Sequence, residues 1–315
     1  MMTTAGRGDV LRASALVIVL ALAGCAPDDG SGAAPGEPDS APALSVFTVN
    51  YPLQYFAQRI GGDRVSVVFP APADIDPAFW RPVPDTIVAY QQADLILLHG
   101  AGYARWTGSA SLPAAHTVDT SVGIRDRLIP IEDAVTHGHG PAGEHSHQGY
   151  AFTTWLDPGL AVEHARAILD AFVEARPQDE SLFRAGFASL EADLVELDRQ
   201  LEDWARGVAD TPVLFSHPVY QYFIRRYGLN AVSLHWEPNE MPDESQWRRL
   251  EGLIHDRGGG WMIWEDRPLE ATVERLRFAG SESVVLATCA NTPHEGDYLA
   301  AMQRGITALK RIGPR

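Results

Sequence analysis

The sequence predicts an α/β fold with two lobes, each a mostly parallel sheet flanked by helices, joined by one long rigid helix. Three observations support this prediction. From residue 44 onward, short apolar runs alternate with longer amphipathic stretches, a pattern typical of α/β proteins. The middle of the chain lacks such runs and carries a long helical pattern instead. The alternation then resumes and continues almost to the C-terminus.

Seven apolar runs are short enough to be strands and are bounded by turn residues. Helical patterns lie between most of them, at 52–60, 85–92, 220–227 and 245–256. Because strands that alternate with helices pair in parallel, we expect a parallel sheet in each half of the chain. The predicted strands are 44–49, 65–69, 95–98, 213–215, 231–234, 261–264 and 284–286.

Two helices are expected between the halves. Asp157 is a good N-cap and Pro158 suits the first helical position, and a second helix should run from Pro177 to about residue 205. At 1.5 Å per residue the second helix would span on the order of 40 Å, enough to run along both lobes. Its apolar residues recur at alternating spacings of four and three, which indicates one buried stripe; a coiled-coil seam is the other interpretation. The stripe consists of Phe183, Phe187, Leu190, Leu194, Leu197, Leu201 and Trp204.

The N-terminus has the features of an exported lipoprotein. Arg7 and Arg12 precede an apolar run at 15–23, which is shorter than the roughly 20 residues that a spanning helix needs. This run therefore predicts a signal peptide. The following stretch, Leu22-Ala23-Gly24-Cys25, resembles the bacterial lipobox, and the resemblance implies that the Cys25 thiol carries a lipid. An ordinary secretory signal with a chance cysteine is the alternative.

Composition excludes several classes of partner and function. With 41 acidic against 25 basic residues and a formal net charge of −16, the chain is not expected to bind nucleic acid or an anionic membrane surface. Because Cys25 takes the lipid, Cys289 is left alone and no internal disulfide is expected. The sequence has neither a His-Glu-x-x-His motif nor a nucleophile elbow, so an enzyme is not expected. A hydrolase with Glu265 as general base is the weaker alternative.

A histidine-rich loop precedes the middle helices. His137, His139, His145 and His147 fall within eleven residues that contain no apolar residue except Ala and Pro. Neutral imidazole is the commonest protein ligand for zinc, copper and nickel. We therefore expect this loop to bind metal weakly and exchangeably, and to feed or regulate a better site. A solvated low-complexity loop is the alternative.

Three polar residues lie within two positions of the ends of predicted strands. His217, Glu265 and His235 each stand at the carboxyl end of a candidate parallel strand, where ligand-binding crevices form in α/β sheets. His217 is the strongest candidate, and Glu265 and His235 follow. The remaining histidines outside the loop are expected to be structural, packing or surface residues: His99, His116, His164, His255 and His294.

Together these motifs resemble the zinc- and manganese-type solute-binding proteins of ABC transporters, the cluster A-I family of metal-binding lipoproteins. The resemblance implies two α/β lobes joined by one long helix, and a monomer in the cell envelope, lipid-anchored on its periplasmic or extracytoplasmic face. It implies Zn²⁺ as cargo, with Mn²⁺ or another divalent metal as alternatives, and an ABC transporter permease as partner. The matching pieces, in order, are Tyr51-Pro52-Leu53, Arg59-Ile60-Gly61-Gly62-Asp63, Asp76-Pro77, Pro82-Val83-Pro84, Ala93-Asp94-Leu95-Ile96, Trp155-Leu156-Asp157-Pro158, Ser216-His217, Tyr227-Gly228-Leu229 and Glu265.

The ligand positions that the resemblance implies are mostly changed in this chain. The family usually holds its ion with three histidines and a carboxylate or a water, and here only His217 matches. Ala78, Thr153 and Ala287 stand at the other positions. Alanine offers no donor atom and a neutral hydroxyl is a poor zinc ligand, so the usual site is absent. A rearranged set of His217, Glu265, His235 and the histidine-rich loop is expected instead.

Two further functions remain open on the same scaffold. The cargo could be a metal chelate or a small organic solute, or the protein could be an envelope zinc chaperone without a transporter. Four tryptophans near the expected crevice would suit an organic cation through cation-π contact, although core packing is the simpler interpretation of each. They are Trp80, Trp155, Trp236 and Trp264.

The predicted domain organisation follows from these segments. A signal peptide occupies 1–24, and a linker rich in Gly, Ser, Pro and Ala runs over 25–43 from the lipidated Cys25. The N-terminal lobe is 44–157 and contains the histidine-rich loop 137–147. Connecting helices occupy 158–208, and the C-terminal lobe is 209–315.

Overall fold

The computed structural model describes residues 43–131, 136–138, 144–146, 149–257 and 260–313. The signal peptide, Cys25 and most of the linker lie outside the described residues, as do His139 and His147. Along the described part of the chain, no helix is both long enough and apolar enough to cross a membrane.

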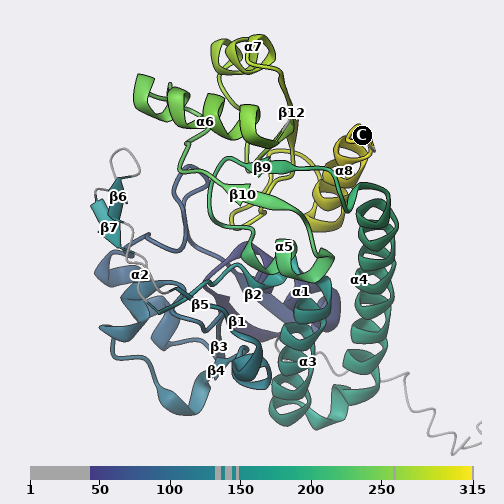
Figure 1. The fold of residues 1–315 in the computed structure, drawn as a ribbon. Coiled ribbons are helices and arrows are strands. Elements are labelled where there is room, and N and C mark those ends of the chain that lie inside the picture. The colour runs from purple at the N-terminus through teal and green to yellow at the C-terminus, as the bar shows by residue number, and fades with distance from the viewer. Residues whose placement is uncertain (1–42, 132–135, 139–143, 147–148, 258–259, 314–315) are drawn as a thin grey trace, which may run out of the picture. The chain divides into compact units, whose positions relative to one another are not determined.

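The first sheet contains four parallel strands in the order β2-β1-β3-β4 (Figure 1). These are β1 (Leu44–Thr48), β2 (Val65–Val68), β3 (Leu95–Leu98) and β4 (Thr117–Asp119), and helices α1 (Tyr51–Gly61) and α2 (Pro84–Gln91) lie between the first three in sequence. Strand β4 escapes sequence prediction because its three residues are all half-buried and include one aliphatic side chain, Val118.

The second sheet repeats this arrangement with the order β10-β9-β11-β12, again all parallel. In both sheets the first strand lies between the second and the third. The connections that follow the first and the third strand therefore lead to opposite edges of the sheet, which creates a topological switch point between these two strands. The seven predicted strands are all present, and the predicted pair of parallel sheets is confirmed. The second sheet and its helices are β9 (Val213–Phe215), α5 (Gln221–Tyr227), β10 (Ala231–Ser233), α6 (Glu244–Arg257), β11 (Gly260–Trp264), α7 (Glu270–Phe278), β12 (Ser281–Val285) and α8 (Tyr298–Leu309).

Shorter elements complete the described chain. Antiparallel pairs join β5 (Pro130–Ile131) to β8 (Gly149–Tyr150) and β6 (Thr136–Gly138) to β7 (Glu144–Ser146). Short 3₁₀ helices occur at Gly62–Arg64, Arg105–Gly108, Ala114–His116, Val122–Arg127, Thr154–Leu156 and Pro177–Asp179.

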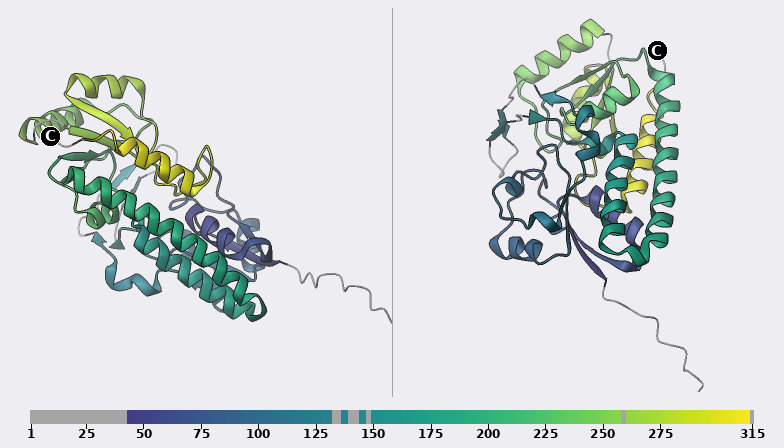
Figure 2. Two further views of the ribbon diagram at one scale, coloured as in Figure 1. Left: turned by 90° about the vertical axis from the view of Figure 1, so that its right-hand side faces the viewer. Right: turned by 90° about the horizontal axis from the view of Figure 1, so that it is seen from below.

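The two predicted middle helices are α3 (Pro158–Ala175) and α4 (Glu180–Val208), which is 29 residues long. As predicted, Asp157 caps α3, and its Oδ1 accepts hydrogen bonds from the backbone N–H of Gly159 at 2.9 Å and of Leu160 at 3.3 Å. All seven residues of the predicted apolar stripe are buried. They face the protein's own helices, because α4 packs on α3, α1 and α8 (Figure 2). The stripe therefore belongs to the core of this chain, and the single long helix is confirmed.

Helix α4 contacts helices of both sheets, α1 of the first and α8 of the second. Its crossing with α1 is close because residue 186 is glycine: a Cβ there would lie 2.5 Å from the carbonyl oxygen of Ile60. Arg59 of α1 adds an ion pair of 2.6 Å to Asp193 of α4. One rigid helix thus connects the helical layers of the two sheets.

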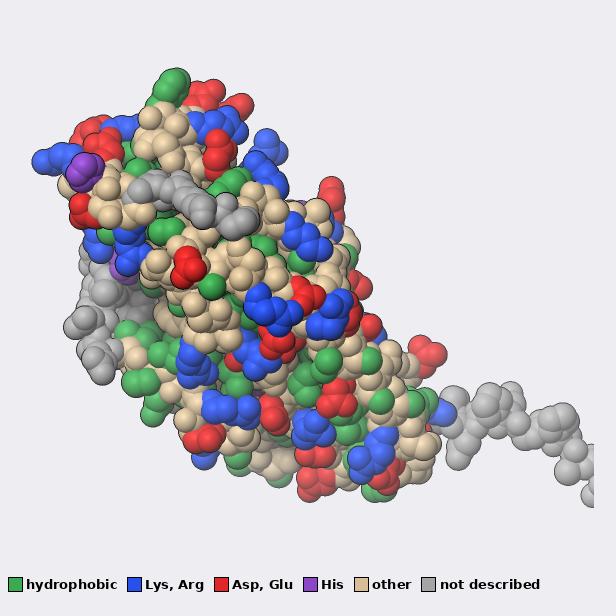
Figure 3. All heavy atoms as spheres, turned by 45° about the vertical axis from the view of Figure 1, so that its right-hand side comes forward, with side chains coloured by type: hydrophobic (Ala, Val, Ile, Leu, Met, Phe, Trp, Pro, Cys, Tyr) green, Lys and Arg blue, Asp and Glu red, His purple; other side chains and the backbone are tan. Residues whose placement is uncertain are grey.

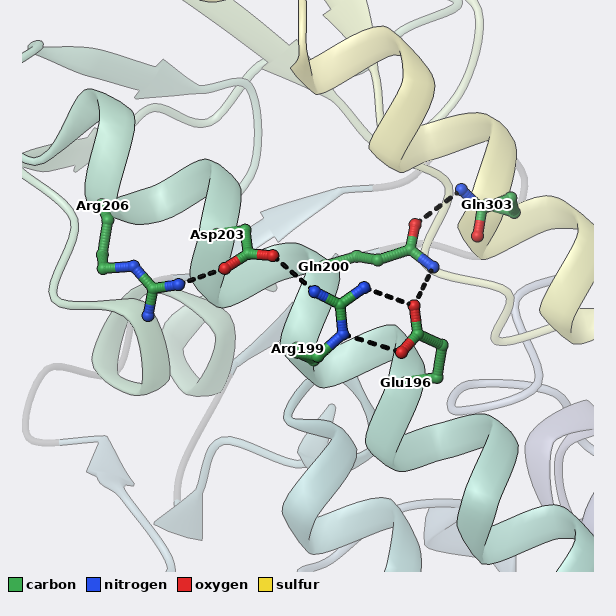
Figure 4. A network of polar contacts seen from close by, with 6 residues as sticks. All are labelled: Glu196, Arg199, Gln200, Asp203, Arg206 and Gln303. Atoms are coloured by element: carbon green, nitrogen blue, oxygen red, sulfur yellow. Dashed lines mark hydrogen bonds and ion pairs between the residues drawn. The ribbon is translucent and has the colours of Figure 1, made fainter.

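The solvent side of α4 carries a chain of ion pairs (Figure 4). Arg199 contacts Glu196 one turn before it and Asp203 one turn after it, both at 2.7 Å. Gln200 donates to Glu196 and accepts from Gln303 of α8 at 3.0 Å, which ties the two helices together. Acidic and basic side chains are interspersed over the face seen in Figure 3, as expected for a solvated surface.

Candidate metal centre

His217 and Glu265 come together where two neighbouring strands of the second sheet end. The backbone N–H of Ser216 donates to Ile263 at 2.9 Å, so the pairing of β9 with β11 continues up to the residue before His217. His217 is 4% exposed. Its Nδ1 lies 3.5 Å from Oε1 of Glu265. The structure therefore joins two of the three residues that the strand ends predict.

A second carboxylate, from Glu237, lies on the other side of the imidazole. Its Oε1 is 3.7 Å from Nε2 of His217. The backbone N–H of Trp236 donates to Ser216 at 2.7 Å, which continues the chain of β10 alongside β9 and brings Glu237 beside His217. The sequence prediction missed Glu237. It stands two residues after His235, and in an extended chain residues two apart point to the same side. This spacing is the signal that could have found Glu237.

The spacing of these groups is longer than that of an N–H···O hydrogen bond, which is 2.7–3.2 Å. Two ligands bound at about 2.1 Å in a tetrahedral arrangement lie about 3.4 Å apart. The distances of 3.5 and 3.7 Å are close to this value, so each end of the His217 ring faces a carboxylate at the separation of two metal ligands. Among the described residues, no three His, Cys, Asp or Glu side chains are already gathered to hold an ion.

Negative charge accumulates around Glu265. Its side chain is 20% exposed. Burial, followed by the negative charges of Glu237 and Asp76, raises the pKa of Glu265 well above its ordinary value. Asp266 adds to the same effect. A divalent cation would relieve this repulsion, because the carboxylates that repel one another would all attract it.

His235 lies in an adjoining cavity. Its ring centroid is 6.3 Å from that of His217. It lines a cavity of about 180 Å³ together with Glu237, Glu240 and Met241. Burial and then the positive charge of Arg249 lower the pKa of His235, which keeps the imidazole neutral and able to bind a metal.

At the three positions where the family resemblance implies metal ligands, the side chains of this protein are placed as follows. Ala78 is buried, and its backbone N–H donates to Oδ1 of Asp76 at 2.9 Å. The Thr153 hydroxyl donates to the Val219 carbonyl, so its proton is already used in a hydrogen bond. Ala287 packs against the core. None of these three described side chains is therefore a histidine or carboxylate that could act as the ligand that the family resemblance implies.

Three of the four tryptophans near the crevice pack in the core, and the fourth, Trp80, is half-buried against another tryptophan. Trp155 is fully buried and its Nε1 donates to the Thr288 carbonyl at 2.6 Å. Trp236 and Trp264 belong to one buried cluster, with ring centroids 6.2 Å apart. Trp80 packs edge-on against Trp106 at 6.5 Å. These contacts confirm the packing interpretation and give no support to a cage for an organic cation.

Two other histidines form a buried network behind Trp155. Nε2 of His99 and Nε2 of His164 each lie 2.7 Å from Oγ1 of Thr154, and Nδ1 of His164 lies 2.7 Å from Oγ1 of Thr120. The two imidazole rings stack with centroids 4.4 Å apart. Burial is the main cause that lowers the pKa of His99, and it lowers the pKa of His164 to about 3. Both are structural residues, as predicted, and both are neutral.

The described part of the histidine-rich loop is the pair β6–β7. Its antiparallel register places His137 opposite His145 along the backbone (Figure 1). His139 and His147 lie outside the described residues.

Comparison with known proteins identifies the family. Residues 46–312 match the model of the family described as "zinc-uptake complex component A, periplasmic" (ZnuA). The chain therefore belongs to this family of extracytoplasmic metal-binding components of ABC transport. This membership makes it a transport component and not an enzyme, as predicted.

Individual relatives and structures agree with this assignment. The chain is 25% identical over 302 residues to the high-affinity zinc uptake system protein ZnuA of Bacillus subtilis (strain 168), covering 92% of this chain and 93% of the relative. It is 25% identical over 226 residues to the manganese-binding lipoprotein MntA of Halalkalibacterium halodurans, covering 71% and 69%. The crystal structure of the metal-dependent lipoprotein YcdH from Bacillus subtilis superposes with a TM-score of 0.73 at 23% identity, over 86% of this chain and 99% of that one, which confirms the fold.

Proposed function

We propose that this protein captures a divalent metal ion, zinc in the first place, at His217 and Glu265 and delivers it to the permease of an ABC importer. The observation that carries the proposal is the 3.5 Å separation between His217 Nδ1 and Glu265 Oε1, the spacing of two ligands on one ion. Membership of a zinc-uptake family supports the cargo. A lipid on Cys25 would keep the protein close to the permease.

Glu237 and His235 flank the proposed ligand pair. Because Nδ1 and Nε2 of one imidazole point in different directions, an ion bound at Nδ1 leaves Glu237 to orient the ring through Nε2, while His235 would supply a further imidazole. Glu237 faces the second nitrogen of His217 at 3.7 Å, and His235 shares a cavity with Glu237. Neutral imidazole and carboxylate are both good ligands for zinc. With Ala78 and Thr153 unable to contribute, most of the protein ligands would come from the second sheet.

The histidine-rich loop is proposed to collect the ion. Four imidazoles in a short segment, His137, His139, His145 and His147, bind metal without a fixed geometry and release it readily. Such a loop would raise the local concentration of metal near the crevice. Its removal should therefore slow loading at low metal concentration and leave the final affinity of the crevice unchanged.

Equilibrium dialysis of the purified protein against zinc and manganese tests the proposal. Wild type should bind one equivalent with high affinity, and a variant lacking residues 137–147 should retain that equivalent. The double variant His217→Ala/Glu265→Gln should lose it. His255→Ala, at an exposed position of α6, is the matched control and should bind like wild type. Absence of stoichiometric binding by both wild type and the loop deletion would refute the metal cargo.

A further inference from the structure

His217 stands where the chain leaves the second sheet and turns back. The backbone N–H of Ser216 donates to the Ile263 carbonyl at 2.9 Å, so the residue before His217 is still bonded to β11. Two residues after His217, the backbone N–H of Val219 donates to the His217 carbonyl at 2.9 Å and closes a tight turn. The sheet therefore fixes one side of His217, and the turn that ends at Val219 fixes the other.

Thr153 bonds to this turn from a segment 66 residues earlier in the chain. Its hydroxyl donates to the Val219 carbonyl. Thr153 is only 4% exposed, so little water reaches the hydroxyl to compete for this bond. Val219 is thus held at both of its backbone polar groups, with its N–H bonded to His217 and its carbonyl to Thr153.

The next residue, Thr154, anchors the same segment to the first sheet through the buried histidine network. The Thr120 hydroxyl donates its one proton to the Leu98 carbonyl at 2.9 Å. Nδ1 of His164 must therefore donate to Thr120, and in a neutral imidazole this leaves Nε2 to accept from Thr154. The Thr154 proton is then used, so Nε2 of His99 donates to Thr154. Every contact in this chain has one donor and one acceptor, which fixes Thr154 in a single orientation.

Trp155 fixes the segment from the side of the second sheet. Its Nε1 donates to the Thr288 carbonyl at 2.6 Å, and its own carbonyl accepts from the Tyr298 hydroxyl at 3.1 Å. Thr153 therefore extends its hydroxyl from a rigid base. A side chain that is itself held in this way restrains the group that it bonds.

We propose that Thr153 is a positioning residue for the metal centre: its hydroxyl holds the turn at Val219 and thereby fixes where the His217 imidazole points. This inference rests on the proposed function. The family resemblance implies a metal ligand at residue 153. In this chain the same position would serve the ion indirectly, by orienting the histidine that remains.

Amide hydrogen exchange of the metal-free protein, followed by NMR, measures the hold on the turn. Thr153→Val removes the hydroxyl and keeps the branched shape, so exchange of the Val219 amide should become about three- to tenfold faster, the value of one hydrogen bond. Thr153→Ser keeps a hydroxyl and should exchange like wild type. Thr117→Val is the matched control. It removes a hydroxyl bond of 2.9 Å to the Pro113 carbonyl at the amino end of β4, and the Val219 amide should exchange as in wild type.

Titration of the same variants with Zn²⁺ alone measures the consequence for binding. Thr153→Val should weaken zinc affinity about three- to tenfold, whereas Thr153→Ser and Thr117→Val should stay within about twofold of wild type. Bound Co²⁺, whose absorption spectrum reports the geometry of its ligands, should show a changed spectrum in Thr153→Val and the wild-type spectrum in Thr117→Val. A loss of stability that leaves the His217 ring in place would not change this spectrum.

Two results would overturn the inference. Unchanged exchange of the Val219 amide in Thr153→Val would show that the hydroxyl does not hold the turn. Wild-type zinc affinity together with an unchanged Co²⁺ spectrum in that variant would show that the hold does not position His217. Wild type that binds no zinc would instead refute the proposed function, and the wild-type titration alone shows this outcome.

Discussion

Glu265 Oε1 and His217 Nδ1 lie 3.5 Å apart at the ends of β11 and β9, on two sides of the switch point of the second sheet. At this edge of a parallel sheet the strands diverge and leave room for a ligand. Glu237 approaches from β10 at 3.7 Å. Three adjacent strands thus bring one imidazole and two carboxylates together without any help from the first sheet.

Replacing either carboxylate should weaken metal binding. Glu265→Gln and Glu237→Gln keep the side-chain shape and remove the charge, so each should lower zinc affinity more than about tenfold. Glu265→Gln should also raise the melting temperature of the metal-free protein, because it removes a carboxyl group crowded by Asp76 and Glu237. Competition with a fluorescent chelator measures the affinity. Wild-type affinity in both variants would exclude a role for these carboxylates in metal binding.

Asn291 should hold Asp76 in position. Its Nδ2 donates to the carbonyls of Pro72 and Ile75, at 2.7 and 2.8 Å, so it fixes the segment directly before Asp76. Asn291→Ala should therefore lower metal affinity about two- to tenfold, equivalent to losing about one hydrogen bond. Its melting temperature should change little, since these bonds are near the surface. A large fall in stability with unchanged affinity would contradict this role.

The crossing of α1 and α4 should depend on Gly186. Gly186→Ala places a methyl group 2.5 Å from the Ile60 carbonyl oxygen, and it should lower the free energy of unfolding by about 1–3 kcal/mol. Gly207→Ala, on the same helix with no atom within 4 Å of its added Cβ, should leave the stability unchanged or raise it by up to about 1 kcal/mol. Urea denaturation measures the free energy of unfolding of the two variants. Equal changes in both variants would refute a tight crossing of α1 and α4.

Acid should destabilise the fold through His99 and His164. Both have a lowered pKa in the folded protein, for His164 about 3, against about 6.5 in the unfolded chain. The unfolded chain therefore binds more protons, and the stability that is complete above about pH 6.5 falls as the pH drops below it. Each histidine contributes up to about 1.4 kcal/mol per pH unit.

Denaturant titrations of the metal-free protein between pH 7.5 and 5 should show this slope. His164→Gln removes one of the two groups and should reduce the slope by about half. A stability that stays constant across this range would contradict the burial of two neutral imidazoles.

The sequence determined by itself every strand of the two four-stranded sheets except β4, the long helix and the two residues at the carboxyl ends of β9 and β11. These features depend on local properties: the period of apolar residues, the cap at Asp157, and the rule that ligands gather at the ends of parallel strands. Strand β4 was missed because it is short and half-buried, so its pattern carries no signal.

Only the tertiary structure decided which side chains meet. Strand order places Glu237 beside His217, and helix packing places Gly186 against Ile60, although neither pair is adjacent along the chain. Packing also buries Trp155, Trp236 and Trp264 and uses the Thr153 hydroxyl in a hydrogen bond to the Val219 carbonyl. Local pattern specifies where an element begins and ends, whereas distances between side chains depend on how sheets and helices pack, which no local pattern encodes.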